Sequence, residues 1–329
     1  MNAVEIEEAV SQLAEAPFDS EEFPFAFLIN PYLITGVNTI IQPISKPISS
    51  VDEMSFGNMP NEGGFLLLDQ IEAENATKKH QVKSHFIRHF IGSQEFIKGQ
   101  QRRCIWINDD EYPEAKHNAW LSDRFESVRI KRETSNRQTT KQLADTPYRF
   151  GEVRQRGDER VIVVAAISSE NRDFLPCGLL QRGTIISNKC YALYDAPLWN
   201  MAIIASRLHW VWIGTVCVRM RTDFSYSNTL GWNTFPVPTL TEKNKTDLTR
   251  CAEDILLARE QYFPATIADM YDPERMDKEF PLVREAHDRN DEVLERIYIG
   301  RRFKNDTERL EKLFELYTKM TTPKSSSRL

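Results

Sequence analysis

The sequence has few of the features that mark secreted or metal-bound proteins. Its five cysteines are scattered and no two form a CxxC pair, which argues against a zinc knuckle and a disulfide framework. The N-terminus has neither a basic region nor an apolar stretch, so no signal peptide is predicted. His85 and His89 lie four residues apart but lack a carboxylate at ligand spacing, which favours surface histidines over a metal site. We therefore expect a reduced, cytoplasmic protein without a bound metal.

Long apolar runs are also lacking. The most apolar window, residues 196–218, carries Arg207 and His209 near its middle. A charged side chain is costly in the centre of a bilayer, and it is tolerated more easily in a helix within a protein core. The window therefore predicts a buried helix, and no membrane partner is expected.

Motifs for catalysis are missing as well. The chain has no glycine-rich loop for S-adenosylmethionine after a first strand and no [DNS]-P-P-[FYW] motif, because Asn30-Pro31-Tyr32 lacks the second proline. P-loop, GxSxG and HExxH motifs are absent, and no acidic pair fits the PD-(D/E)xK pattern of nucleases. The residues predict neither a catalytic nor a cofactor-binding site in this chain, and whether the chain is an enzyme stays open.

The charge is unevenly distributed. The net charge is −6, but residues 1–45 hold seven acids and no Lys or Arg, whereas residues 46–240 hold 25 bases against 22 acids. Binding to phosphates depends on local basic surface and not on the charge of the whole chain. The acidity weakens the case for a nucleic-acid partner without excluding it.

One stretch, residues 128–144, is rich in charge of one sign. Its only acid is Glu133, and Ser, Thr and Gln side chains lie between the bases. This pattern fits a helix that lies along a phosphate backbone, and an ordinary solvated helix face is the alternative. The candidate backbone contacts are Arg129, Lys131, Arg132, Arg137 and Lys141.

Residues 219–238, RMRTDFSYSNTLGWNTFPVP, have the densest set of side chains that can pair with base edges. Arg221, Asp223 and Ser225 alternate at its start, and an aromatic–proline segment closes it. Arg can donate two hydrogen bonds to guanine, and Asp can accept from the cytosine amine. The alternative is that Arg221 and Asp223 form a surface salt bridge with each other, which would contribute less than about 1 kcal/mol.

The periodicity along the chain predicts an α+β fold, in which a β-rich domain with inserted helices precedes a small helical domain. Strands are expected within 32–41, 51–68, 85–107 and 161–167, with tight turns at 56–58 and 61–64, and helices within 2–16, 68–80, 111–143 and 196–216. After Pro238 the pattern predicts three further helices, within 239–263, 282–298 and 306–318. We divide the chain into an acidic leader or linker helix (1–28), a recognition domain (29–240) and a C-terminal helical domain (241–329).

Five segments occur in an order that resembles the target-recognition region of MmeI-like DNA methyltransferases, which are single-chain restriction–modification enzymes. They are FGNMPNEGG (56–64), GSQEFIKGQQRRCIWI (92–107), TPYRFGEV (146–153), SSENRDFLP (168–176) and RTDFSYSNTLGWNTFPVP (221–238). The segments from LARE through ATIADMYDPERM to LFELY are similar to the closing helical domain of the same family. The resemblance covers residues 29–317.

The resemblance implies that nuclease, spacer and adenine-N6 methyltransferase domains, with their S-adenosylmethionine, precede such a region and are absent here. Arg221, Asp223 and Ser225 match the variable base-reading positions, and Asn188 and Lys189 are a second, weaker pair. The implied function is a sequence-specific recognition module for double-stranded DNA that works with a methyltransferase domain in cis or in trans. The alternative is a protein-interaction subunit whose helical domain docks a separate methyltransferase chain.

Overall fold

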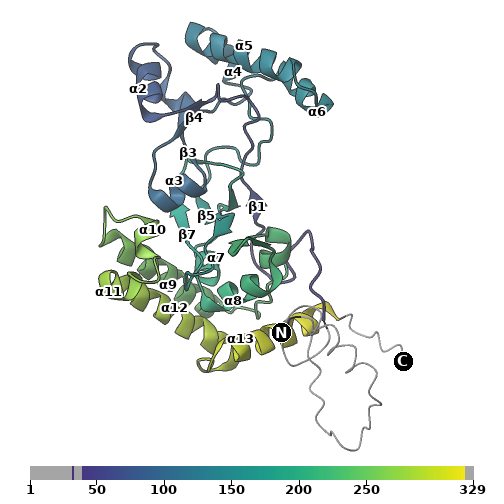
Figure 1. Ribbon diagram of the computed structural model, residues 1–329, viewed down its shortest axis with the longest axis vertical. Helices are drawn as coiled ribbons and strands as arrows, with labels where there is room; N and C mark the ends of the chain where they lie inside the picture. The colour runs from purple at the N-terminus through teal and green to yellow at the C-terminus, as the bar shows by residue number, and fades with distance from the viewer. Residues whose placement is uncertain (1–31, 33–38, 323–329) are drawn as a thin grey trace, which may run out of the picture.

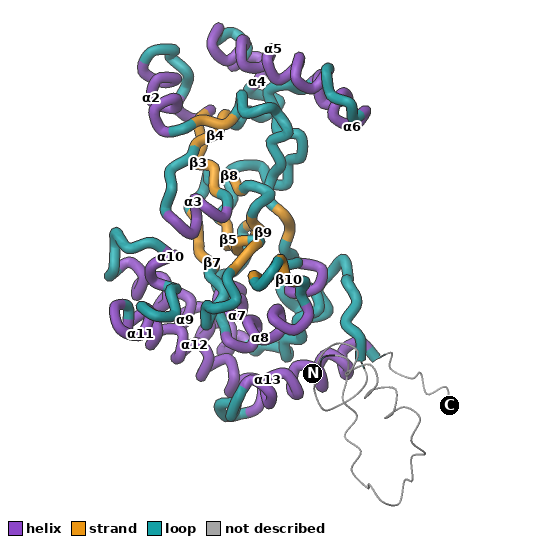
Figure 2. Tube along the Cα trace, viewed as in Figure 1, coloured by secondary structure: helices purple, strands orange, loops and turns teal. Residues whose placement is uncertain are grey.

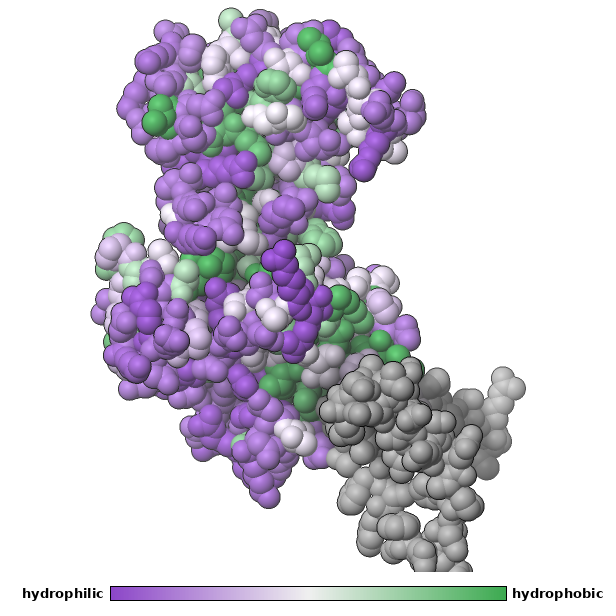
Figure 3. Space-filling view, viewed as in Figure 1, coloured by the Kyte–Doolittle hydropathy of each residue, from purple (hydrophilic) through white to green (hydrophobic). Residues whose placement is uncertain are grey.

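The computed structural model describes residue 32 and residues 39–322. Helices α2 (Gln70–Lys78) and α5 (Ala119–Glu133) lie at one end of its long axis, and α12 (Pro281–Ile299) and α13 (Asp306–Thr321) lie at the other (Figure 1). Most strands lie between the two ends, where the molecule is narrower (Figure 3). The mixture of sheets and helices, with a helical C-terminal region, confirms the predicted α+β class.

The sheet next to α2 has the order β2-β4-β3-β8. Its strands are β2 (Leu67–Leu68), β3 (Ile87–Ile91), β4 (Arg103–Ile105) and β8 (Ile185–Ile186). Strands β3 and β4 form the antiparallel pair predicted within 85–107, and β8 joins β3 in parallel from a distant part of the chain. The prediction missed helix α3 (Ser93–Lys98) between β3 and β4, where the Glu95 carboxylate accepts a hydrogen bond from the Gly92 N–H at 2.9 Å. Six residues are too few for helical periodicity to show.

The helices predicted around this sheet are present. Asp69 caps α2, because its carboxylate accepts from the Glu72 N–H at 2.7 Å. The region 111–143 is mostly helical, and buried side chains of α5 pack with Phe86, Phe90 and Phe150 in one core cluster. The remaining short elements here are η1 (Ser84–Phe86), α4 (Tyr112–Ala115), α6 (Gln138–Lys141) and η2 (Gln142–Asp145).

The turn at residues 61–64 has the backbone that the sequence predicts. Asn61, Gly63 and Gly64 all have positive φ angles. The Glu62 carboxylate accepts hydrogen bonds from the backbone N–H groups of Gly64, at 2.9 Å, and Leu66, at 2.5 Å. These N–H groups are therefore bound by the turn's own acid, which leaves the turn unsuited to cradle a phosphate. At 56–58, in contrast, no φ is positive.

The central sheet has the order β1-β9-β5-β7 and is antiparallel. Its strands are β1 (Ser55–Phe56), β5 (Val161–Ala165), β7 (Cys177–Leu180) and β9 (Cys190–Tyr194). Every residue of β5 is buried, as its unbroken apolar sequence predicts. Val161 and Val163 belong to one core cluster and Ile162 and Val164 to another, so both faces of the sheet are covered.

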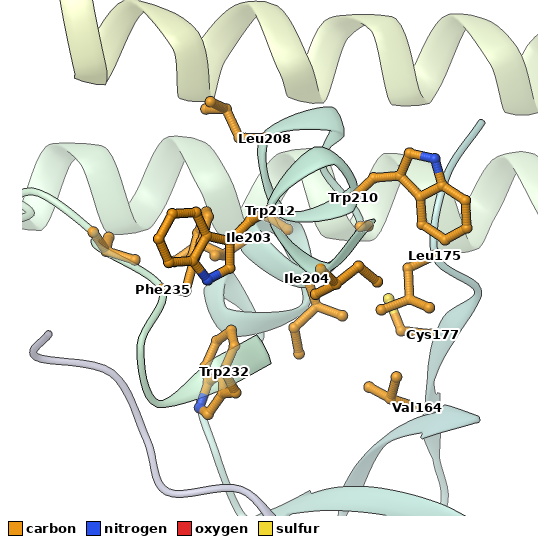
Figure 4. Packing of buried hydrophobic residues seen from close by; sticks show 14 of the residues in the cluster. Val164, Leu175, Cys177, Ile203, Ile204, Leu208, Trp210, Trp212, Trp232 and Phe235 are labelled. Atoms are coloured by element: carbon orange, nitrogen blue, oxygen red, sulfur yellow. The ribbon is translucent and has the colours of Figure 1, made fainter. Parts of the chain in front are cut away.

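The apolar window forms two buried helices, α7 (Trp199–Ile204) and α8 (Arg207–Val216), where a single helix was expected. The break occurs at Ser206, whose hydroxyl accepts from the His209 N–H at 3.1 Å and so caps α8. Figure 4 shows aromatic side chains of α8 packing against those of the segment after residue 228, which include Trp232 and Phe235. Across the described ranges, no helix is both long and apolar enough to span a membrane.

The C-terminal helices begin where the sequence predicts. Thr241 caps α9 (Glu242–Glu260), and two short helices, α10 (Ile267–Met270) and α11 (Met276–Glu279), precede α12 and α13. Arg259 of α9 donates a hydrogen bond to the carbonyl oxygen of Cys177 on β7 at 2.6 Å. The His287 imidazole of α12 lies 2.6 Å from the Tyr271 hydroxyl and 3.1 Å from the carbonyl oxygen of Ala205. Buried polar contacts therefore join these helices to the central sheet and to the end of α7.

Two predictions concern residues outside the described ranges. The helix expected within 2–16 and the leader assigned to 1–28 lie wholly outside them, and the strand expected within 32–41 lies mostly outside them. Of that strand, residues 32 and 39–41 are described, and none of them is in a strand.

Candidate nucleic-acid interface

The segment that begins at residue 219 forms a β-hairpin on a small sheet. Strand β10 (Arg219–Met220) pairs with β11 (Asp223–Ser225), and β11 pairs with β6 (Ile167–Ser168), both antiparallel. Because Met220 is paired with Asp223, only Arg221 and Thr222 form the turn. Arg221 has a φ of +61°, a backbone conformation that side chains other than glycine rarely adopt.

One face of this small sheet packs against the core. Phe224 is 6% exposed, and its ring centroid lies 4.8 Å from that of Trp210 in α8. Arg219, which is paired with Phe224 in the ladder, places its guanidinium carbon 4.8 Å from the centroid of the Phe224 ring and forms an ion pair with Glu170. Arg219 therefore belongs to the packed side of the hairpin.

The opposite face of the small sheet points away from the core and carries two of the predicted base-reading residues. Side chains alternate along a strand, and directly paired residues share a face, so Asp223 and Ser225 lie opposite to Phe224. Met220 shares this face because it is paired with Asp223. We call this surface the outward face: Met220, Asp223, Ser225 and Ile167, with Val218, whose carbonyl oxygen accepts from the Ser225 N–H at 2.9 Å.

Arg221 and Asp223 do not form the salt bridge that was the alternative to base reading. Within residues 39–322, Arg221 is exposed and makes no ion pair or side-chain hydrogen bond with another described residue, and neither does Asp223. Arg172, half-buried beside the hairpin, donates to the Ser168 hydroxyl at 3.1 Å. Burial lowers the pKa of Arg172, and the nearby charge of Asp223 acts in the opposite direction. In the described part of the chain, Arg221 is therefore a cation without an ion-pair partner, and Asp223 is an acceptor that lies near Arg172 without bonding to it.

The second predicted pair, Asn188 and Lys189, lies next to the hairpin. These residues form the turn between β8 and β9. The carbonyl oxygen of Lys189 accepts from the Ala166 N–H at 3.1 Å, and the carbonyl oxygen of Ala166 accepts from the Tyr226 N–H at 2.9 Å. Ala166 thus links the 188–189 turn to Tyr226, which follows β11 and lies at the opposite end of that strand from the Arg221–Thr222 turn.

The position of the 188–189 turn depends on a glycine in a neighbouring segment. The Asn188 N–H donates to the carbonyl oxygen of Asn58 at 2.9 Å. A Cβ atom on Gly57 would lie 2.3 Å from the carbonyl oxygen of Ser187, which is closer than any side chain permits. Gly57 therefore allows the segment at 57–58 to run against the turn, so this glycine serves backbone packing.

The five candidate backbone contacts in the basic stretch, residues 128–144, are in three different environments. The prediction that Arg132 contacts a phosphate is wrong. Arg132 is fully buried, because it faces the core between α5 and the following turns. Its guanidinium donates hydrogen bonds, at 2.7 to 3.4 Å, to the carbonyl oxygens of Pro60, Asn61, Leu143, Thr146 and Arg149. A side chain with all these internal partners cannot contact a phosphate group, so Arg132 is a structural residue.

Arg129 is exposed but engaged. Its guanidinium forms ion pairs with Glu126 at 2.5 Å and with Glu133 at 2.6 Å, one turn away on either side. These hydrogen-bonded carboxylates raise the pKa of Arg129. Only Glu133 lies within the basic stretch, because Glu126 precedes it. The two carboxylates largely neutralise the guanidinium, so Arg129 should attract a phosphate group less strongly than an unpaired arginine.

Three cations of the stretch are available to a ligand. Lys131, Arg137 and Lys141 are exposed, and none forms an ion pair with another described residue. Lys131 also lines a polar cavity with Asn61, Gly63, Arg132, Thr134, Ser135, Asn136 and Thr140. Helices α5 and α6 lie at the end of the molecule far from β10 (Figure 2), so the structure does not bring these cations and the hairpin together.

The structure also adds residues that the sequence analysis did not select. Val218 and Met220 are 68% and 59% exposed on the outward face, beside Asp223. The alternation of VRMRTDFS could have indicated a strand with these two residues on one side. The two histidines at 85 and 89 are both exposed, and no group of three or more candidate metal ligands occurs in the described part of the chain.

Comparisons with known proteins match nearly the whole described chain. Residues 35–239 match the family described as "MmeI, target recognition domain", and residues 240–323 match "MmeI, C-terminal domain". DNA methyltransferase A of Bacillus subtilis (strain 168) is 39% identical over 293 residues, which are 89% of this chain and 33% of that protein. The chain thus spans about one third of the length of this curated relative.

A solved structure gives the same result for the fold. It is the type IIL restriction-modification enzyme MmeI in complex with DNA, with a TM-score of 0.82 and 31% sequence identity. The match covers 89% of this chain and 39% of that chain. At this similarity both the fold and the ancestry are shared.

Proposed function

The chain belongs to the MmeI family, of which it contains the target recognition and C-terminal domains, and on this basis we propose that it recognises a specific sequence in double-stranded DNA. It serves as the recognition module of an adenine-N6 DNA methyltransferase or restriction–modification enzyme. Methyl transfer, and any cleavage, is performed by catalytic domains that act with it in cis or in trans.

The observation that carries this proposal is the arrangement of the hairpin and the neighbouring turn. Arg221 and Asp223 belong to the hairpin, and Lys189 belongs to the turn that Ala166 links to the residue after β11. Within the described ranges none of these three side chains forms an ion pair. An Arg fork, a carboxylate and an exposed lysine are the groups that discriminate base edges in the major groove. A two-stranded β-ribbon fits into that groove.

Lys131, Arg137 and Lys141 would hold the phosphate backbone at the other end of the molecule. Contacts to phosphates carry no sequence information, but they make binding dependent on salt. Replacing Lys131 with Ala should therefore weaken binding to all sequences alike and reduce the magnitude of the salt slope by about 1. Arg129→Ala should have a smaller effect, because Glu126 and Glu133 already engage that guanidinium.

Binding to a randomised duplex library at two salt concentrations tests the proposal. We expect enrichment of one asymmetric site of several base pairs, with an affinity that falls as salt is raised. Binding that is indifferent to both sequence and salt would contradict the proposed function. The full 329-residue chain should be used, because it contains both matched domains.

The described residues do not fit a binding site for S-adenosylmethionine. The Gly63-Gly64 turn is closed by the Glu62 carboxylate, and Gly57 packs against the backbone of Ser187. We therefore assign the cofactor to the methyltransferase domain, which would supply the methyl group. Addition of S-adenosylmethionine to this chain alone should leave its melting temperature unchanged, and a clear increase would contradict this assignment.

A second candidate function, docking of a separate methyltransferase chain, is favoured by a groove between α9 and α12 that is lined by both apolar and charged residues. Leu257 and Leu282 line it and are 56% and 46% exposed, and Asp254, Glu285 and Arg289 also line it. Co-purification with a methyltransferase chain, lost in Leu257→Asp and kept in the control Ile71→Asp on α2, would support docking at this groove. Equal co-purification of both variants would reject it.

A further inference from the structure

Two apolar side chains are exposed along the first strand of the hairpin. Val218 is 68% exposed and Met220 is 59% exposed, and both lie on or beside β10, the edge strand of the three-stranded sheet. Exposed apolar side chains on an edge strand favour unwanted association, so proteins usually place charged residues there. Their presence on this face calls for a ligand that covers them.

The ladder fixes what stands beside each of the two side chains. Met220 is paired with Asp223, and Val218 lies opposite Ser225. Cross-strand neighbours lie about 5 Å apart, whereas base pairs in a duplex are stacked about 3.4 Å apart. The two side chains of one cross-strand pair, such as Met220 and Asp223, can therefore contact the same base pair or two successive base pairs.

We infer that the outward face reads pyrimidine methyl groups, with Met220 and Val218 contacting the C5-methyl groups of thymines in the major groove. This inference rests on the proposed function and adds to it a class of base. Thymine's C5-methyl is the apolar group that unmodified DNA presents in the major groove, and apolar side chains recognise it. Asp223, beside Met220, accepts a hydrogen bond from an amine of adenine or cytosine at the same step or the next.

The adjacent cations support DNA over a protein partner at this face. Arg221 follows Met220 directly, and Lys189 lies on the β6 side of the small sheet, where its carbonyl oxygen accepts from the Ala166 N–H. Both side chains are exposed, and neither forms an ion pair within the described ranges. A duplex matches such an arrangement, because phosphates flank the groove that holds the methyl groups. The competing occupant is the surface of a methyltransferase domain, and the experiment below separates the two.

The test replaces thymine with deoxyuridine, which lacks only the C5-methyl group. A duplex with the site selected from the library is prepared with each thymine replaced in turn. With the unmodified chain, we expect one or two replacements to weaken binding by about three- to fivefold, the effect of burying one methyl or methylene group. Met220→Ala should bind the thymine and deoxyuridine duplexes equally at one of these positions, and Val218→Ala at another if two are found.

Two variants control for indirect effects. Met220→Leu keeps an apolar side chain of similar size and should retain the sensitivity to deoxyuridine. Ile71→Ala removes an apolar side chain that is 72% exposed on α2, and it should behave like the unmodified chain.

The outcomes separate this inference from the proposed function. A defined site whose thymines can all be replaced without loss of affinity, or a site without thymine, would overturn methyl reading and leave sequence-specific recognition intact. Loss of co-purification with a methyltransferase chain in Met220→Ala, with unchanged DNA binding, would assign the face to the protein partner instead. Failure to select any site would overturn both proposals.

Discussion

Charged side chains of the helix α12 and of the β10–β11 hairpin have opposite environments. On α12, Glu295 is fully buried and accepts hydrogen bonds from Arg309 at 2.6 and 2.8 Å and from the Phe303 N–H at 2.9 Å. On the hairpin, Arg221 is exposed and forms no ion pair within the described ranges. Glu295 is therefore satisfied within the protein, whereas Arg221 has no ion-pair partner in the described part of the chain.

The contrast occurs again within the basic stretch that was predicted to bind phosphates. Arg132 is bonded to carbonyl oxygens inside the protein, while its neighbour Lys131 faces solvent. Residue type and sequence position do not separate these two roles, because adjacent residues on a helix point in different directions. The presence or absence of internal partners does separate them.

The largest effect is expected from Arg132→Ala. The substitution leaves buried carbonyl oxygens without donors, and it should lower the free energy of unfolding by about 3–5 kcal/mol. Lys131→Ala is the matched control and should change it by less than about 0.5 kcal/mol. Urea denaturation measures both. Similar free energies of unfolding for the two variants would contradict the structural role of Arg132 and its contrast with the exposed Lys131.

Arg221→Ala should affect DNA recognition and not stability. It should relax selectivity at one base position by about 1–3 kcal/mol and leave the unfolding midpoint almost unchanged. Arg219→Ala provides the comparison, because Arg219 packs on Phe224 and pairs with Glu170, and it should not change selectivity. Library selection with both variants measures the effect, and relaxed selectivity in the Arg219 variant alone would contradict the assignment.

The buried polar groups predict a pH dependence of stability. Burial lowers the pKa of His209 to about 3 and, with the charge of Arg259, holds that of His287 well below its usual range. As pH falls below about 6.5, the unfolded chain binds protons at these histidines and the folded chain does not, so stability is lost. Burial raises the pKa of Asp291 to about 7, which acts in the opposite direction between about pH 7 and pH 4.

The pKa of His89 is lowered as well, by partial burial and the charge of Arg103, and burial raises the pKa of Asp288. The lowered histidines outnumber the raised carboxyls, so stability should fall between pH 6.5 and pH 5 by on the order of 1 kcal/mol per pH unit. Asp291→Asn removes the opposing group and can still accept the hydrogen bond from the Arg207 N–H, which is 2.7 Å long. Its stability should therefore fall more steeply with decreasing pH than that of the unmodified chain. Parallel unfolding curves for the two proteins between pH 6.5 and pH 5 would refute this assignment.

The smallest effect is expected from Arg221→Gly. Glycine adopts a φ of +61° without steric cost, but it also increases the entropy of the unfolded chain. The free energy of unfolding should stay the same or rise by up to about 1 kcal/mol, while selectivity is relaxed as in Arg221→Ala. Thermal unfolding measures the first effect and library selection the second. A clear loss of stability would show that the Arg221 side chain has a structural partner.

Much of the local structure could be predicted because its causes are local. The helices that Asp69 and Thr241 cap lie within the predicted ranges 68–80 and 239–263, and the apolar residues 161–165 form a buried strand. The ordered motifs were sufficient to identify the family, which the comparisons confirm. The division at residue 28, the base-reading roles and the backbone contacts of the exposed cations stay predictions.

The amino-acid sequence by itself determined the fold class, the family and the segment in which base-pairing side chains are concentrated. Only the tertiary structure decided which of these side chains are available. Strand register places Asp223, Ser225 and Met220 on one outward face, and Ala166 links the turn of Lys189 to the residue after β11. Burial removes Arg132 from the interface. Pairing and burial depend on residues far apart in the chain, so no local pattern around residues 132 or 221 could specify them.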